Sequence, residues 1–103
     1  MIKLQLIGNL GADAEKKSIE SSKFDVIEFN VATTEKRGEK EVTTWVKVSK
    51  WVKPESRLAQ YLKKGTKVFI SGSPSAQAYL DRQEGHPKAS LCVNANELEL
   101  LSK

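Results

Sequence analysis

Hydrophobic and polar residues alternate most regularly at residues 43–51, which read Thr-Thr-Trp-Val-Lys-Val-Ser-Lys-Trp. Successive side chains of a β-strand point to opposite faces, so this period of two predicts a strand. The two faces carry Trp45, Lys47, Ser49 and Trp51 on one side and Val46, Val48, Lys50 and Val52 on the other. The valine face is expected to lie in the core. Both tryptophans of the protein lie on the other face, about 20 Å apart at ~3.3 Å per residue.

Two large rings and a cation on one strand face are typical of a surface that binds a single-stranded nucleic acid. Bases stack on the rings, and the cation attracts phosphates. Trp45 and Trp51 are therefore candidate stacking residues, and Lys47, which alternation places between them, is a candidate phosphate contact. The alternative is that one or both rings belong to the core of a strand buried on two sides, because large aromatic side chains are usually mostly buried.

Similar patterns predict four further strands. They cover residues 2–10, 24–34, 67–73 and 89–95. Gly72 and Pro74 are expected to break or bulge the fourth strand of the chain, after which residues 75–80 resume as an extended arm that carries Tyr79. The polar residues 12–23 are expected to form a loop or a poorly paired continuation of the first strand.

A charged stretch centred on a glycine, residues 35–41, predicts a hairpin loop before the tryptophan strand. Lys36 and Arg37 in this loop are candidate phosphate contacts. The alternative is a solvated loop of mixed charge, and this interpretation is favoured for most of its residues.

One α-helix is predicted, over residues 54–64. It would begin with a proline, which suits the first helical turn because its missing N–H costs nothing there. Leu58, Tyr61 and Leu62 have the spacing of one buried stripe, and Gly65 is placed for a C-terminal cap. Core packing is therefore the favoured role for Tyr61, over base stacking.

The predicted order is three strands, one helix and a long hairpin. This is the order of a five-stranded Greek-key barrel of the OB type, an all-β fold with one α-helix between strands three and four. The length of 103 residues suits one compact domain, so residues 1–103 are expected to form a single OB-fold domain.

Composition excludes several classes of site. The chain has 17 Lys and Arg against 13 Asp and Glu, and its net charge of +4 is compatible with a polyanionic partner. Cys92 is the single cysteine, so no disulfide can form within the chain, which suits a reducing compartment. His86, the single histidine, has no Cys or His neighbours and is a poor metal ligand.

The sequence also argues against catalysis and against membrane insertion. It contains no Ser/His/Asp arrangement, Walker loop or metal cluster, so an enzyme is not expected, nor is any cofactor, metal or small-molecule substrate. No stretch approaches the roughly 20 apolar residues of a membrane helix, and no signal-peptide pattern is present. A cytoplasmic protein is expected.

Several motifs together resemble the bacterial single-stranded-DNA-binding protein family. They are Ile-Gly-Asn-Leu-Gly at 7–11, Val-Ala-Thr-Thr-Glu at 31–35, Thr-Trp at 44–45, Leu-Ala-Gln-Tyr-Leu-Lys-Lys-Gly at 58–65 and Phe-Ile-Ser-Gly at 69–72. The resemblance runs in order from residue 1 to about residue 101. It implies an OB fold, a homotetramer and DNA wrapped over several subunits.

The resemblance also implies roles for individual residues. Trp45, Trp51 and Tyr79 fall where the family has stacking aromatics. A further aromatic common in the family's hairpin is replaced here by Lys36 and Arg37, so an electrostatic contact takes its place or the contact is absent.

The expected function is binding of single-stranded DNA with little sequence preference, in replication, recombination or repair at the nucleoid. The chain resembles a short form without the family's acidic C-terminal tail, because it stops at Lys103. One alternative is an accessory factor like primosomal replication protein N, which is a dimer of the same fold. The other is an OB-fold module for protein assembly, whose aromatic face pairs with protein.

Overall fold

The computed structural model describes residues 1–19, 23–80 and 87–101, except the side chains of residues 77–80 and 87–89. Six strands and one short 3₁₀ turn follow one another along the described chain. They are β1 (Leu4–Leu10), β2 (Glu15–Ser18), β3 (Asp25–Arg37), β4 (Lys40–Val52), η1 (Leu58–Tyr61), β5 (Lys67–Leu80) and β6 (Pro87–Leu100). In these described ranges, no helix is long and apolar enough to cross a membrane.

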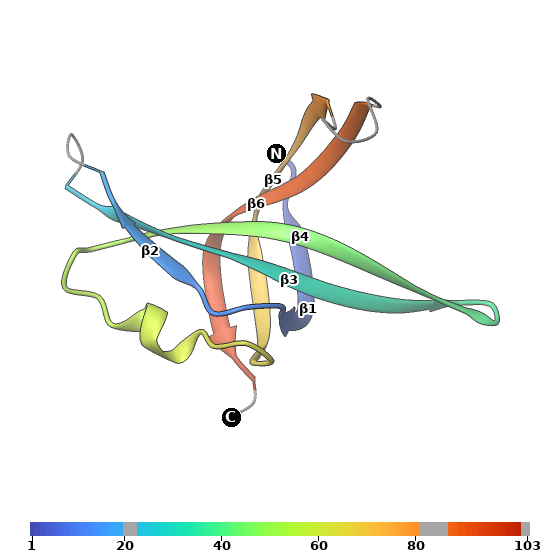
Figure 1. The fold of residues 1–103 in the computed structure, drawn as a ribbon, viewed down its shortest axis with the longest axis horizontal. Coiled ribbons are helices and arrows are strands. Elements are labelled where there is room, and N and C mark those ends of the chain that lie inside the picture. Colours follow the sequence, from blue (N-terminus) through green and yellow to red (C-terminus); the bar gives the residue numbers. More distant parts are fainter. Residues whose placement is uncertain (20–22, 81–86, 102–103) are drawn as a thin grey trace.

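Five of the strands form a closed barrel, as predicted (Figure 1). The strands neighbour one another in the order β1-β5-β6-β4-β3, and pairing between β1 and β3 closes the ring. The pairing of β4 with β6 is parallel and the other pairings are antiparallel. The polar segment that was expected to pair poorly supplies β2, a four-residue strand on the outer edge of β3.

Two hairpins extend beyond the barrel as arms, one formed by β3 and β4 and the other by β5 and β6 (Figure 1). The β3–β4 strands pair up to Arg37 and Lys40, so the predicted seven-residue loop is a two-residue turn. Gly38 is the first turn residue and has φ +64°. A glycine with positive φ at this place is what a type II′ hairpin turn requires.

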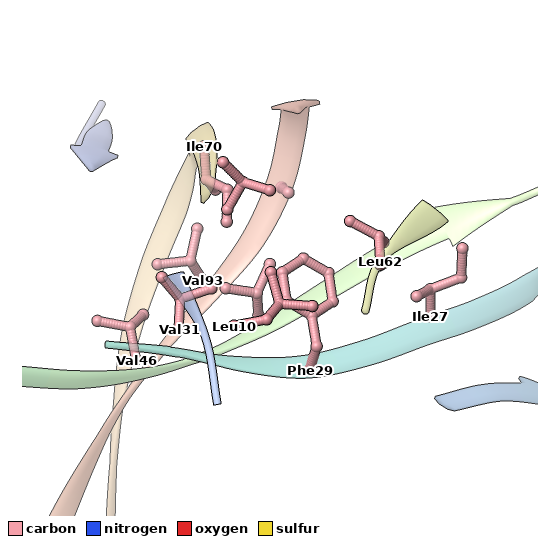
Figure 2. Packing of buried hydrophobic residues seen from close by; sticks show 11 residues of the cluster. Leu10, Ile27, Phe29, Val31, Val46, Leu62, Ile70 and Val93 are labelled. Atoms are coloured by element: carbon pink, nitrogen blue, oxygen red, sulfur yellow. The ribbon is translucent and has the colours of Figure 1, made fainter. Parts of the chain in front are cut away.

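The barrel interior is filled by aliphatic side chains and one phenylalanine (Figure 2). The buried cluster consists of Leu10, Ile27, Phe29, Val31, Val46, Val48, Leu62, Val68, Ile70, Val93 and Ala95. In this cluster, β3, β4, β5 and β6 contribute alternate residues, as expected for strands with one face in a core. Burial of this apolar surface, at roughly 25 cal/mol per Å², is the main force that holds the barrel closed.

The bulge that was predicted in the strand of residues 67–73 is present in β5. The register between β5 and β6 shifts between Ser71 and Gly72. A Cβ atom at Gly72 would collide with the backbone carbonyl of Asn94. Glycine therefore lets β6 approach closely where β5 bends out of the barrel into the arm.

The prediction of an α-helix between the third and fourth barrel strands, which are β4 and β5, is wrong. The short 3₁₀ turn η1 takes its place. An α-helix needs each carbonyl to accept a hydrogen bond from the N–H four residues later. The Lys16 ammonium instead donates to the carbonyls of Pro54 and Ser56, at 2.6 and 3.0 Å. The Gln60 N–H correspondingly donates to the carbonyl of Arg57, three residues earlier, at 3.1 Å. This spacing is that of a 3₁₀ turn.

The short turn still delivers one side chain to the core. Leu62 follows η1, is fully buried and packs against the cluster at one end of the barrel (Figure 2). Its carbonyl accepts a hydrogen bond from the Ala14 N–H at 2.9 Å. Tyr61, by contrast, is 61% exposed, so the expectation that it packs in the core is wrong.

Candidate nucleic-acid interface

Strand β4 places the two tryptophans on the outer surface of the barrel. Trp45 is 57% exposed and Trp51 is 45% exposed, whereas Val46 and Val48 are at most 2% exposed. Lys47 lies on the tryptophan side and is exposed. The predicted division of this strand into a core face and an outer face is therefore confirmed, and neither indole is sealed in the interior.

The neighbouring strands extend this outer face sideways. On β3, the residues opposite Trp45, Lys47, Ser49 and Trp51 are Ala32, Asn30, Glu28 and Val26. On β6, Cys92 lies beside Lys47 and Asn94 beside Ser49. We call the surface formed by Trp45, Lys47, Ser49 and Trp51 with these four β3 residues the tryptophan face. It has an aromatic ring toward each end and polar groups between them.

The ring of Trp45 rests on the chain just after β1. A Cβ atom at Gly11 would lie 2.5 Å from Cζ3 and 2.7 Å from Cη2 of Trp45. Real Cβ atoms do not approach so closely, so the ring packs in a space that only glycine leaves open. The Gly11 N–H donates to the carbonyl of Asn30 at 3.1 Å, which fixes this support relative to β3.

The centre of the tryptophan face carries a carboxylate held by two lysines. Glu28 Oε1 lies 3.1 Å from Lys17 Nζ, and Glu28 Oε2 lies 3.4 Å from Lys47 Nζ. The hydrogen bond from Lys17, together with the attraction of both cations, lowers the pKa of Glu28, although partial burial opposes this. The same hydrogen bond raises the pKa of Lys17. At neutral pH, the Glu28 carboxylate and the Lys17 ammonium are therefore both ionised.

Sequence reasoning missed Glu28 as a member of this face and Lys17 as the residue of β2 that pairs with it. The signal for Glu28 was present, because alternation puts it opposite the apolar side of its strand. Its position beside Ser49 depends on the register of the hairpin, which a seven-residue loop leaves open. Lys17 reaches the face only through the pairing of β2 with β3, and the four polar residues of β2 carry no strand pattern.

The two candidate residues of the hairpin lie on different faces of it. Lys36 lies opposite Glu41, on the side that alternation shares with Trp45. Arg37 lies on the other side, 3.7 Å from the Glu35 carboxylate. There it borders a hollow of about 460 Å³ on the valine side of the arm. The structure therefore aligns Lys36 with the tryptophan face and separates Arg37 from it.

The third predicted aromatic is placed only through its backbone. Tyr79 belongs to β5 and pairs with Lys88 of β6, toward the end of the second arm. Its side chain lies outside the described part of the chain, as does all of His86.

Cys92 is a free cysteine of intermediate exposure, beside Lys47 on the outer face.

Two small open hollows flank the ion pair on the tryptophan face. One, of about 260 Å³, lies toward β2, and the other, of about 250 Å³, lies toward β6; Glu28 and Lys47 line both. Both fall below the ~300–1,000 Å³ of typical small-molecule pockets. Among the described residues, no group of three or more His, Cys, Asp or Glu is placed to hold a metal ion.

Comparisons with known proteins identify relatives of this chain. The model of the single-strand binding protein family matches residues 1–101. The single-stranded DNA-binding protein of Chlamydia muridarum is 31% identical over 97 residues, which cover 94% of this chain and 60% of that protein. Single-stranded DNA-binding protein 1 of Synechocystis sp. is 31% identical over 99 residues, covering 95% of this chain and 81% of that protein.

A solved structure has the same fold. It is a Plasmodium falciparum SSB complex with ssDNA, and it matches with a TM-score of 0.75 at 24% identity, covering 99% of this chain and 96% of that chain. The chain spans 60% of the length of the Chlamydia relative. The family model, which matches almost the whole sequence, and the curated relatives together show that the chain belongs to the single-strand binding protein family.

Proposed function

We propose that this protein binds single-stranded DNA with little sequence preference, by stacking bases on the tryptophan face and contacting phosphates with lysines. The single observation that carries the proposal is the exposure of both indoles, 57% and 45%, on one strand of an OB barrel. Membership of the family and the structural neighbour, which is a complex with single-stranded DNA, support the same binding role rather than catalysis.

Stacking alone would give moderate affinity. Each stacked base contributes ~1–3 kcal/mol, so Trp45 and Trp51 together would supply roughly 2–6 kcal/mol before the cost of ordering the strand. Tyr79 is proposed as a third stacking residue on the second arm. Every base presents a π-face, so this contact does not distinguish one base from another.

Phosphate contacts would supply much of the remaining affinity. Lys47 lies between the two rings, and Lys36 continues the same face along the hairpin arm. Arg37 is proposed to reach phosphates only where the strand passes around the arm. Each contact to a single strand lowers the logarithm of the binding constant by about 0.7 per decade of salt. Binding is therefore expected to weaken markedly as salt is raised.

The biological setting proposed here is replication, recombination or repair at the nucleoid, in the cytoplasm. A homotetramer is proposed as the working form, with a dimer as the alternative. Either assembly would place several tryptophan faces on one DNA strand and raise the overall affinity by tethering. Family membership supports this setting.

The test is to replace each ring and measure affinity for oligo(dT) by fluorescence anisotropy. Trp45→Ala and Trp51→Ala are each expected to weaken binding by ~1–3 kcal/mol, about 5- to 150-fold, with the fold intact. Tyr61→Ala is the control, because Tyr61 is at least as exposed as the two tryptophans but lies after β4, beside Lys64 and Leu101. It is expected to leave affinity unchanged.

Unchanged affinity in both tryptophan variants, with folding shown by circular dichroism, would remove the proposed site. If the variants instead change the oligomeric state and no salt-sensitive DNA binding is found, the tryptophan face is a protein interface. The assembly module would then be the better interpretation.

A further inference from the structure

The acidic residue on the tryptophan face stands where phosphates are proposed to bind. Glu28 lies opposite Ser49 on β4 and opposite Glu15 on β2. Along the strand it falls between the Trp51 position and the Lys47 position. A carboxylate in the middle of a surface for a polyanion needs an explanation, because like charges repel.

The contacts of Glu28 show what this carboxylate does in the free protein. Each of its carboxylate oxygens forms an ion pair with a different lysine, Lys17 at 3.1 Å and Lys47 at 3.4 Å. The Glu28 side chain is only 22% exposed, whereas the two lysine side chains are 57% and 53% exposed. The carboxylate therefore lies beneath two cations that face the solvent. A phosphate approaching the face meets lysines that already have an anionic partner.

We propose that Glu28 is an intramolecular competitor for phosphate, which occupies Lys17 and Lys47 in the free protein and limits the affinity of the tryptophan face. The inference rests on the proposed binding of single-stranded DNA. In the bound state, Lys47 exchanges the Glu28 carboxylate for a phosphate of the strand, and no covalent bond changes.

The geometry allows this exchange at low cost. Glu28 and Lys47 line both hollows of the tryptophan face, so a short swing of the flexible lysine side chain brings its ammonium group over either hollow. Glu28 retains its ion pair with Lys17 after Lys47 has moved to the phosphate, so the partly buried carboxylate still has a cation beside it. The exchange therefore breaks one half-exposed ion pair, an interaction of modest strength.

The experiment compares Glu28→Gln with Glu15→Gln, using oligo(dT) and the full chain. Both variants remove one negative charge, and the two positions are direct neighbours across β2 and β3. Glu15 makes no ion pair with Lys17 or Lys47 among the contacts of the described residues, whereas Glu28 pairs with both. Glu28→Gln is expected to tighten binding by about two- to fivefold at low salt, and Glu15→Gln by less.

Two further measurements test whether the effect of Glu28→Gln is electrostatic and depends on the two lysines. The gain from Glu28→Gln is expected to shrink toward 1 M salt, where charges more than about 3 Å apart are screened. In a protein that also carries Lys17→Gln and Lys47→Gln, Glu28→Gln is expected to give no more gain than Glu15→Gln. This comparison measures the coupling between the carboxylate and the two lysines.

The inference is overturned if Glu28→Gln binds oligo(dT) no more tightly than Glu15→Gln does. Weaker binding would also overturn it, because Glu28 would then hold Lys47 in place or contact the bases itself. The Trp45→Ala and Trp51→Ala variants keep the two proposals apart. If they lose affinity while Glu28→Gln gains none, the binding site stands and only the competitor role fails.

Discussion

The two indoles of the tryptophan face are supported differently. Trp45 lies against the backbone at Gly11, which follows β1. Trp51 lies opposite Val26, which is 7% exposed and pairs on its other side with Lys17 of β2. Each ring thus has an apolar or backbone surface under part of it and solvent over the rest. A ring held in this way is already oriented for stacking, so little side-chain freedom remains to be lost on binding.

The support under Trp45 gives a prediction for Gly11→Ala. The added methyl group would fall 2.5 Å from Cζ3 of Trp45, so the ring must move. We expect weaker binding of oligo(dT), with a loss smaller than that of Trp45→Ala because the displaced ring is still present. The measurement is anisotropy, together with the emission maximum of Trp45 in a Trp51→Phe background. An unchanged emission maximum would show that the ring does not rest on Gly11.

The charge cluster gives a prediction for pH. The pKa of Glu28 lies below its ordinary value of 4.5, chiefly because Lys17 donates a hydrogen bond to the carboxylate. Folding therefore favours the ionised form. The resulting stability is fully present above pH 4.5 and is lost as the pH falls through the lowered pKa of the folded state.

Wild type is accordingly expected to lose more stability than Glu28→Gln between pH 7 and about pH 3. The difference should be modest, about 0.2–1 kcal/mol, because both lysines are more than half exposed. Urea denaturation of both proteins at the two pH values measures it. Parallel pH profiles would contradict the ion-pair account of Glu28.

At the scale of elements, the segment between β4 and β5 separates what the pattern could predict from what it could not. The spacing of Leu58, Tyr61 and Leu62 correctly marked Leu62 as buried. The pattern could not show that Lys16, almost 40 residues earlier in the chain, would donate hydrogen bonds to two backbone carbonyls of the expected helix. That contact depends on the tertiary position of β2, so no local propensity signals it.

The hairpin register is a second case of this kind. The residues that β3 contributes to the core cluster are odd-numbered, such as Phe29, whereas those from β4 are even-numbered, such as Val48. Only a register that pairs odd with even residues buries both sets together. The two-residue turn at Gly38 meets this condition, whereas the predicted loop of residues 35–41 would pair Thr34 with Val42 and does not. The barrel strands and the two faces of β4 were therefore predictable. The residues of β3 and β2 that lie beside the tryptophan face were not.

The segment after β4 also gives a stability prediction. Leu62 is fully buried at one end of the barrel, and its neighbour Tyr61 is 61% exposed. Leu62→Ala is expected to lower the free energy of unfolding by about 2–5 kcal/mol, because it leaves a cavity. Tyr61→Ala should change it by at most about 0.5 kcal/mol. Urea denaturation measures both, and equal effects of the two substitutions would contradict the role of Leu62 as the side chain that fills this end of the core.

At the scale of the whole molecule, a compact barrel carries two arms (Figure 1). The tryptophan face lies on β3 and β4, the two strands that also form the first arm. The principal extents are 44 × 34 × 30 Å. The net charge of +4 is modest, so local placement of cations must matter more than the overall field. Single OB folds contact ~4–16 nucleotides. A strand that follows β4 from Trp51 to Trp45 and on toward Lys36 would fit that range.

Quenching of the indole fluorescence by oligo(dT) is the sharpest test of whether both indoles stack on bases. The protein has two tryptophans, so Trp51→Phe leaves Trp45 as the single indole and Trp45→Phe leaves Trp51. We predict that the emission of each variant falls with added oligo(dT) to a plateau, and that a higher salt concentration shifts the midpoint to more DNA. Emission that stays constant in both variants, at DNA concentrations that saturate binding as measured by anisotropy, would contradict the account.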